Sequence, residues 1–148
     1  MTGWRIGYVL GPKDIMQHVL KVHLYNSICA SLPSQHAAIE ALTSSRNTPD
    51  TMNKAYIERR DYVQNRLESI GLSFTQPTGA FYIFPSIKST NITSLEFAMK
   101  LLNDEHVAVV PGSGFTSFGE GYIRISYANS MKNLEIGMDR LERFVNSI

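Results

Sequence analysis

The sequence has few of the features that mark secreted or membrane proteins. It contains one cysteine, Cys29, so no internal disulfide can form, and a single thiol is typical of a reducing compartment. No run approaches the ~20 consecutive apolar residues that a membrane-spanning helix needs. The residues after Met1 lack the basic region and apolar core of a signal peptide. We therefore expect a soluble, cytoplasmic protein with no membrane partner.

An excess of one charge is also missing. The 148 residues carry 14 basic and 13 acidic side chains, for a net charge of +1, and this gives no global field that would attract a polyanion. We therefore expect no nucleic-acid partner. The histidines have neither the i, i+4 spacing on one helix nor the cysteine partners of a zinc site, so no metal site is predicted. They are His18, His23, His36 and His106.

Two glycine-based motifs of enzymes are absent or incomplete. No Gly-x-Ser-x-Gly elbow occurs. The segment "PGSGFTSFGEG" (residues 111–121) is rich in glycine, but a strand-like run follows it, not the helix whose N-terminus would bind phosphate. We interpret this segment as a flexible connection or lid. Cys29 is interpreted as a small buried apolar residue.

The remaining sequence has the patterns of an ordinary globular core, with 43% hydrophobic and 18% charged residues. Apolar periodicity together with start and stop signals predicts five helices. They lie near residues 15–22, 34–42, 48–70, 94–102 and 134–148. Alternating or continuous apolar runs predict strands. These are residues 4–10, 73–75, 81–84, 107–110 and 122–128.

The order of these elements predicts an α/β fold class with an α+β-like small domain. The second half of the chain alternates strand, helix, strand, strand and helix, which favours a small mixed sheet packed with helices. The first strand, residues 4–10, has no local pairing partner. We expect it to belong to a sheet built mostly by residues outside this sequence.

Two arginines, Arg5 and Arg124, lie within apolar, strand-like sequence. A guanidinium keeps its proton at any ordinary pH, so each must reach water, a carboxylate or a phosphate. Either could be a solvated edge residue. The alternative is functional, because the rigid fork of N–H groups matches a carboxylate or phosphate bidentately. Two such forks in one site would hold two anions.

Four stretches of the chain carry a family resemblance. In order they are "MTGWRIGY", "PTGAFYIFP", "VAVVPGSGF" and "GEGYIRISYA". Together they resemble the C-terminal half of a fold type I pyridoxal-phosphate-dependent aminotransferase, of class I/II in the aspartate aminotransferase superfamily. The resemblance implies that residues 1–32 are a strand and helix of the large cofactor-binding domain and that residues 33–148 form the small domain. It also implies a homodimer when the protein is full length.

The resemblance assigns roles to individual residues. Arg5 matches the arginine that binds the phosphate of pyridoxal 5'-phosphate, and Arg124 matches the arginine that binds the substrate α-carboxylate. A segment on the substrate side of the site, where we expect shape and packing rather than proton transfer, corresponds to Gly79, Ala80, Phe81 and Tyr82. Ser113 and Phe115 match a loop near the site entrance.

One departure from the family limits what this chain is expected to do. The lysine that holds the cofactor as a Schiff base should lie about four positions before Met1, and no lysine of the sequence has a matching context. We therefore assign no catalytic residue here. We expect an inactive fragment with an empty cofactor site, from an enzyme that transfers an amino group between an amino acid and a 2-oxo acid.

Two alternatives stay open. The full-length protein could be a pyridoxal-phosphate-dependent C–S lyase or another fold type I enzyme, which release of pyruvate and ammonia from a cysteine conjugate would indicate. The chain could instead be a non-catalytic, stand-alone binding module. That interpretation predicts a gene that begins at Met1 and an opening strand that pairs within the chain.

Overall fold

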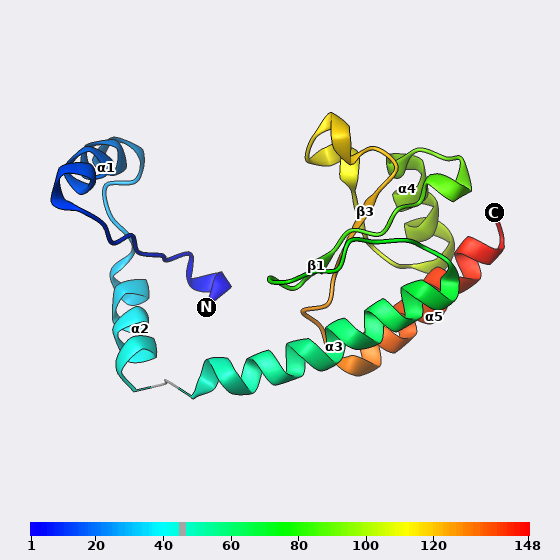
Figure 1. Cartoon of the computed structure of the whole chain (residues 1–148), viewed down its shortest axis with the longest axis horizontal. Coiled ribbons are helices and arrows are strands. Elements are labelled where there is room, and N and C mark those ends of the chain that lie inside the picture. The colour runs from blue at the N-terminus through cyan, green and yellow to red at the C-terminus, as the bar shows by residue number, and fades with distance from the viewer. Residues whose placement is uncertain (45–46) are drawn as a thin grey trace. The chain divides into compact units, whose positions relative to one another are not determined.

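The computed structural model describes residues 1–44 and 47–148 (Figure 1). Contacts within the chain divide it into two compact units, Met1–Asp50 and Thr51–Ile148. The predicted domain boundary between residues 32 and 33 is a different division and stays a prediction. Within the described residues, no helix is long and apolar enough to cross a membrane, and no group of His, Cys, Asp or Glu is arranged to hold a metal ion.

The first unit is helical. A short 3-10 helix at Thr2–Trp4 precedes α1 (Lys13–Asn26) and α2 (Leu32–Thr43). The predicted strand at residues 4–10 is wrong, since residues 5–12 have no regular structure. An extended segment forms a stable strand only when its N–H and C=O groups pair with a neighbour, and no described residue pairs with this one.

The described residues of this first unit form no apolar core. Ser34 is its one buried residue among those described, and its hydroxyl donates to the carbonyl oxygen of Trp4 at 2.8 Å. Large apolar side chains such as Leu10 and Tyr25 are 85% and 94% exposed. Cys29 is exposed as well, so its interpretation as a buried residue is wrong. The same absence of a core explains this difference.

The second unit is built on the long helix α3 (Thr48–Ile70). The Thr-Pro-Asp start signal predicts its first turn, and Gly71 ends it with a φ of +83°. There the N–H of Leu72 donates to the carbonyl of Leu67 at 3.0 Å. A glycine adopts this left-handed conformation without strain, which is why the predicted stop coincides with the observed one.

The sheet of this unit has three short strands in the order β1-β3-β2. They are β1 (Tyr82–Ile83), β2 (Val110–Pro111) and β3 (Ile123–Ser126). The α/β fold class is confirmed, but the sheet is antiparallel rather than mixed, because β1 and β2 both pair antiparallel to β3. The predicted strand at residues 73–75 is reduced to a single bridge between Phe74 and Pro85.

Two further helices, α4 (Ser94–Glu105) and α5 (Met131–Asn146), begin at the side-chain caps that local sequence favours. Thr93 accepts the N–H of Glu96 at 3.2 Å, and Ser130 accepts the N–H of Asn133 at 3.3 Å. Each bond satisfies one of the N–H groups that a helix start leaves without a partner.

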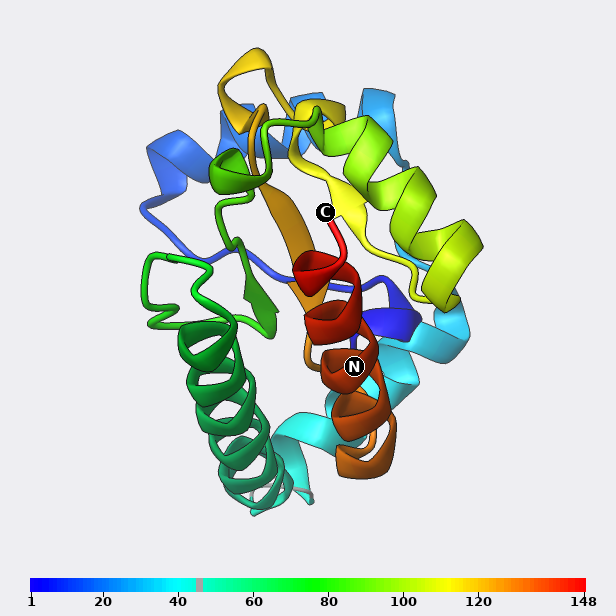
Figure 2. The same ribbon diagram turned by 90° about the vertical axis from the view of Figure 1, so that its right-hand side faces the viewer.

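Helices α3, α4 and α5 pack on one face of the sheet (Figure 2). The buried side chains between the helices and the sheet form the core. They are Val63, Leu67, Leu72, Ile83, Ile87, Phe97, Leu101, Ile123, Tyr127, Leu134, Met138, Leu141 and Phe144. Helices α3 and α5 run side by side in both views, and the guanidinium of Arg66 joins them through Asp139 at 2.7 Å and Glu142 at 2.9 Å.

Leu101 and Leu102 provide a matched test of this core. Leu101 is fully buried, whereas Leu102 is 41% exposed on the same helix. We expect Leu101→Ala to lower the free energy of unfolding by about 2–5 kcal/mol, because it removes buried methyl groups and leaves a cavity. Leu102→Ala should cost less than about 1 kcal/mol. Urea denaturation of both variants measures the difference, and equal losses would contradict the observed orientation of α4.

Candidate functional site

The face of the sheet that the helices leave open carries Arg124. Side chains alternate along β3, so Ile123 and Ile125 point to the helices while Arg124 points to the opposite face. Tyr82 pairs with Ser126 and Val110 pairs with Arg124. Cross-strand and diagonal neighbours on one face lie within reach of long side chains, so both strands next to β3 contribute to the surroundings of Arg124.

Two aromatic rings lie close to the Arg124 guanidinium. Its Cζ atom lies 4.4 Å from the centre of the Tyr82 ring and 4.8 Å from the centre of the Phe115 ring. Phe84 supports Phe115 in an edge-to-face contact, with ring centres 5.7 Å apart. We call Arg124, Tyr82 and Phe115 the arginine clamp. Stacked rings leave the N–H groups at the guanidinium edge available to a planar anion.

No acidic side chain within the described residues forms an ion pair with Arg124. Arg124 is half-buried, so its charge is partly withdrawn from water. A guanidinium cannot become neutral in response to this withdrawal. The clamp therefore holds a permanent positive charge whose in-plane donors have no carboxylate partner in the described part of the chain.

The turn that contains Gly79 reaches the clamp through Phe81. The phenol oxygen of Tyr127 donates to the carbonyl of Ala80 at 3.1 Å and holds Ala80 at a φ of +59°. Burial raises the pKa of the Tyr127 hydroxyl, so it stays a donor at neutral pH. The Phe81 ring lies 4.6 Å from that of Tyr82. Gly79 is exposed, and a Cβ there would meet no atom within 4 Å.

The segment at residues 111–121 differs from the expected flexible connection. It forms two 3-10 helices, Gly112–Gly114 and Ser117–Gly119. Their backbones touch so closely that a Cβ on Gly112 would overlap the carbonyl oxygen of Gly119. The N–H of Gly112 also donates to the carbonyl of Tyr122 at 2.8 Å. This folded loop fixes the position of Phe115.

Arg5 lies in the first unit. It ends the opening 3-10 helix with φ and ψ of 50° and 43°, a left-handed conformation that costs a non-glycine residue about 1–2 kcal/mol. The exposed guanidinium makes one long contact, 3.5 Å from its Nη1 to the carbonyl oxygen of Thr2. Among described residues it has no acidic partner. Its predicted role beside Arg124 stays a prediction.

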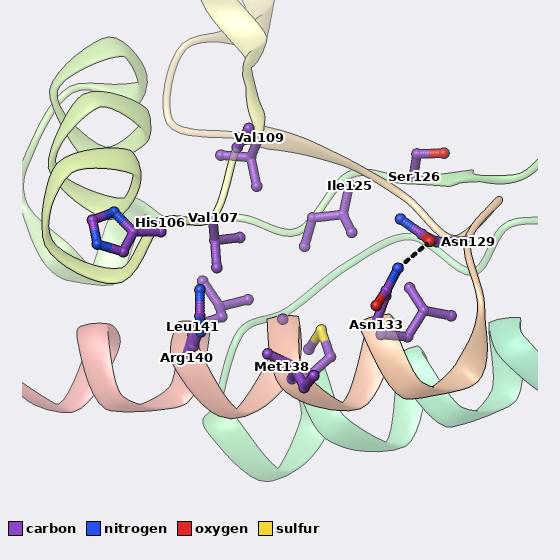
Figure 3. Close-up of a pocket in the computed structure, with 14 residues that line it drawn as sticks. His106, Val107, Val109, Ile125, Ser126, Asn129, Asn133, Met138, Arg140 and Leu141 are labelled. Carbon is purple, nitrogen blue, oxygen red and sulfur yellow. Dashed lines mark hydrogen bonds between the residues drawn. The ribbon is translucent and has the colours of Figure 1, made fainter.

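A hollow lies between β3 and α5 (Figure 3). Its volume is about 460 Å³. Val107, Val109 and Ile125 line it from the sheet side, and Met138 and Leu141 of α5 line it from below (Figure 3). Polar side chains also line this hollow, among them Asn129, Asn133 and Arg140, but Arg124, Tyr82 and Phe115 do not, so it is separate from the arginine clamp.

The sequence predicts Arg124 as a site residue but does not indicate which side chains contact it. It places Tyr82 in a packing segment and Phe115 in a loop, without relating either to the guanidinium. A period-two reading of residues 81–84 would have shown that Tyr82 and Phe84 share one face. The sequence has no comparable signal for the register that brings them beside Arg124.

A profile of the family described as aminotransferase class I and II matches residues 1–141. The chain belongs to this family. Its open sheet face with the arginine clamp is therefore a feature of a class I and II aminotransferase sequence, and the fold type I resemblance carried by the four stretches is confirmed.

Known aminotransferases resemble the chain over nearly all of its length. It is 57% identical to a probable N-acetyl-LL-diaminopimelate aminotransferase of Bacillus subtilis, over 98% of this chain and 37% of that protein. An aspartate aminotransferase of Pyrococcus abyssi is 47% identical, over 97% of this chain and 37% of that protein. The crystal structure of an aromatic aminotransferase from Pyrococcus horikoshii matches with a TM-score of 0.87 and 44% identity.

The chain spans less than half the length of these aminotransferases. The Pyrococcus horikoshii structure is covered to 40%, while 99% of this chain is matched. The similarity therefore identifies the family and supports the fold, and it concerns about two fifths of a typical relative.

The close contact within the folded loop gives a matched pair of glycine substitutions. A Cβ on Gly112 would overlap Gly119, whereas a Cβ on Gly114 would meet nothing within 4 Å. We expect Gly112→Ala to lower the free energy of unfolding by about 1–3 kcal/mol, because the two turns must separate. Gly114→Ala should stay within about 0.5 kcal/mol of the wild type. Thermal denaturation compares the two, and a Gly112 variant as stable as the Gly114 variant would show that the turns are not in contact.

Proposed function

We propose that the chain is the carboxylate-binding portion of a pyridoxal-phosphate-dependent aminotransferase that moves an amino group between an amino acid and a 2-oxo acid. The arginine clamp carries this proposal. A half-buried guanidinium held beside two aromatic rings, with no described acidic partner, is suited to bind an anion at its edge. The α-carboxylate is the group that every amino acid and 2-oxo acid shares.

Arg124 binds and orients the substrate in this proposal. Its rigid fork accepts the two carboxylate oxygens in one plane, which fixes the direction in which the rest of the substrate points. Tyr82 and Phe115 keep the fork from rotating and exclude water from its faces. The aromatic surface formed by Phe81 and Tyr82 supplies shape beside the carboxylate, as expected for a segment on the substrate side.

The cofactor implied by the family is pyridoxal 5'-phosphate, and Arg5 fits its phosphate. The guanidinium of Arg5 is exposed and makes no ion pair with any described acid, and its left-handed backbone is the kind of strain found at ligand sites. When bound, the cofactor withdraws electrons from the substrate carbon that loses its proton. Arg5 would hold the phosphate by charge-assisted hydrogen bonds.

Proton transfer is not a task for the residues around the clamp. Among the described residues, the side chains that contact Arg124 or pair with it across the sheet are Tyr82, Phe115 and Val110, and we assign none of them a proton-transfer step. We infer that the lysine for this step belongs to a preceding segment of a longer protein. The coverage of relatives, 37% for the Bacillus subtilis protein, supports this inference. The proposal extends to a cytoplasmic homodimer as the whole enzyme.

The coding sequence upstream of Met1 tests the inference of a longer protein. We expect an open reading frame that continues upstream and encodes a lysine about four positions before Met1, because that lysine supplies the amine of the reaction. DNA sequencing of this region is sufficient. A stop codon in frame immediately before Met1 would favour the stand-alone binding module instead.

Arg124→Gln in the full-length protein tests the carboxylate role. The variant loses charge-assisted hydrogen bonds worth about 3 kcal/mol or more, so kcat/KM for amino acids should fall about 100-fold or more while cofactor absorbance is retained. Arg59→Gln is the matched control, because Arg59 also stacks on a tyrosine, Tyr56, at 5.5 Å but lies on helix α3. An unchanged kcat/KM in the Arg124 variant would remove Arg124 from the substrate site.

A further inference from the structure

The carboxylate of Glu120 ties the folded loop to the start of α4. Its Oε1 atom accepts the N–H of Ser94 at 2.7 Å and the N–H of Gly121 at 3.0 Å, and its Oε2 atom lies 3.0 Å from the hydroxyl oxygen of Ser94. Ser94 is the first residue of α4 and is fully buried. One side chain from the end of the loop is thus bonded to both the backbone and the side chain of a buried helix start.

These hydrogen bonds have a defined direction. The Ser94 backbone N–H, followed by the Ser94 hydroxyl, lowers the pKa of Glu120, so the carboxylate is ionised at neutral pH and can only accept. The single proton of the Ser94 hydroxyl therefore goes to Glu120. The hydroxyl oxygen of Ser113 lies 2.9 Å from that of Ser94, and with the Ser94 proton on Glu120 this contact runs from Ser113 to Ser94. The N–H of Ser113 points to the same oxygen at 3.4 Å.

The far end of this chain of hydrogen bonds reaches the arginine clamp. Ser113 is the middle residue of the turn Gly112–Gly114, and the N–H of Phe115 donates to the carbonyl of Gly112 at 3.0 Å. Phe115 is 48% exposed, so packing alone constrains its ring weakly. The orientation of the ring over Arg124 then depends on where the turn is held. Backbone contacts of Gly112 with Gly119 and Tyr122 hold one side of the turn, and the link from Ser113 through Ser94 to Glu120 adds side-chain bonds to the start of α4.

We propose that Glu120 is a positioning residue that keeps the Phe115 ring against the guanidinium of Arg124 by way of Ser94 and Ser113. The functional consequence of this positioning rests on the proposed function, in which Arg124 binds a carboxylate. The contact itself does not, because the guanidinium and both rings belong to this chain and lie together without substrate or cofactor. An amide at position 120 can donate as well as accept a hydrogen bond. It would therefore no longer fix the direction of the hydrogen bonds through Ser94 and Ser113.

The Nε–Hε signal of Arg124 in the nuclear magnetic resonance spectrum of the 15N-labelled chain is the readout, assigned with Arg124→Lys. Ring currents from Tyr82 and Phe115 displace this signal, and Phe115→Leu gives its position when one ring is missing. We expect Glu120→Gln to move the signal most of the way to the Phe115→Leu position. Glu96→Gln is the matched control and should leave the signal in place, because Glu96 pairs with Lys100 at 2.8 Å on the outer side of α4.

A signal that moves in Phe115→Leu but stays at the wild-type position in Glu120→Gln would overturn the proposal and leave the carboxylate role of Arg124 intact. A signal that does not move in Phe115→Leu would also overturn it, since the ring would not be in contact. If Glu120→Gln does not fold, Ser113→Ala is measured in its place, because it removes only one hydroxyl from an exposed position. It should shift the signal in the same direction, and an unshifted signal would again contradict the role of Glu120.

Discussion

The permanent positive charge of Arg124 is the main constraint on the structure of the second unit. Arg124 lies in the central strand of a small sheet, where a permanent cation is partly withdrawn from water. The structure compensates this withdrawal with the negative faces of two aromatic rings, 4.4 and 4.8 Å from the guanidinium. The register of β1 brings the Tyr82 ring to the guanidinium, and the folded loop brings the Phe115 ring to it. The strand, the loop and the start of α4 all serve this arrangement.

Side chains alternate between the two faces of β3, so the residues that stabilise the core and the arginine proposed to bind substrate lie on opposite faces. Ile123 and Ile125 face three helices and belong to the core or pack against it, while Arg124 faces away from them. The core can therefore be well packed without filling the face that carries the arginine. The first unit shows the opposite condition, because its described apolar side chains enclose no core. Such surface is typical of segments that pack against other parts of a larger protein.

Local signals in the sequence were sufficient for the helices and insufficient for the strands. Thr93 with Glu96, and Gly71, mark helix ends through contacts within a few residues, so the predicted and observed ends agree. Strand extent depends on a partner elsewhere in the chain, which is why residues 4–10 form no strand. Arg124 could be selected as a candidate from its charge within a strand-like run, and the family resemblance assigned its role. Tyr82, Phe115 and Glu120 could not be recognised from local sequence. Glu120, for example, contacts Ser94, which lies 26 positions away in the chain.

A comparison of two arginines shows why aromatic rings suit a binding group better than acids do. Arg66 also lies near a tyrosine ring, at 5.9 Å, but Asp139 and Glu142 occupy its N–H groups and make it a structural link between α3 and α5. An acid beside Arg124 would occupy the same donors and compete with any incoming carboxylate. Rings orient the guanidinium through its faces and leave its edge open. An arginine that is held but not neutralised is therefore prepared to bind an anion.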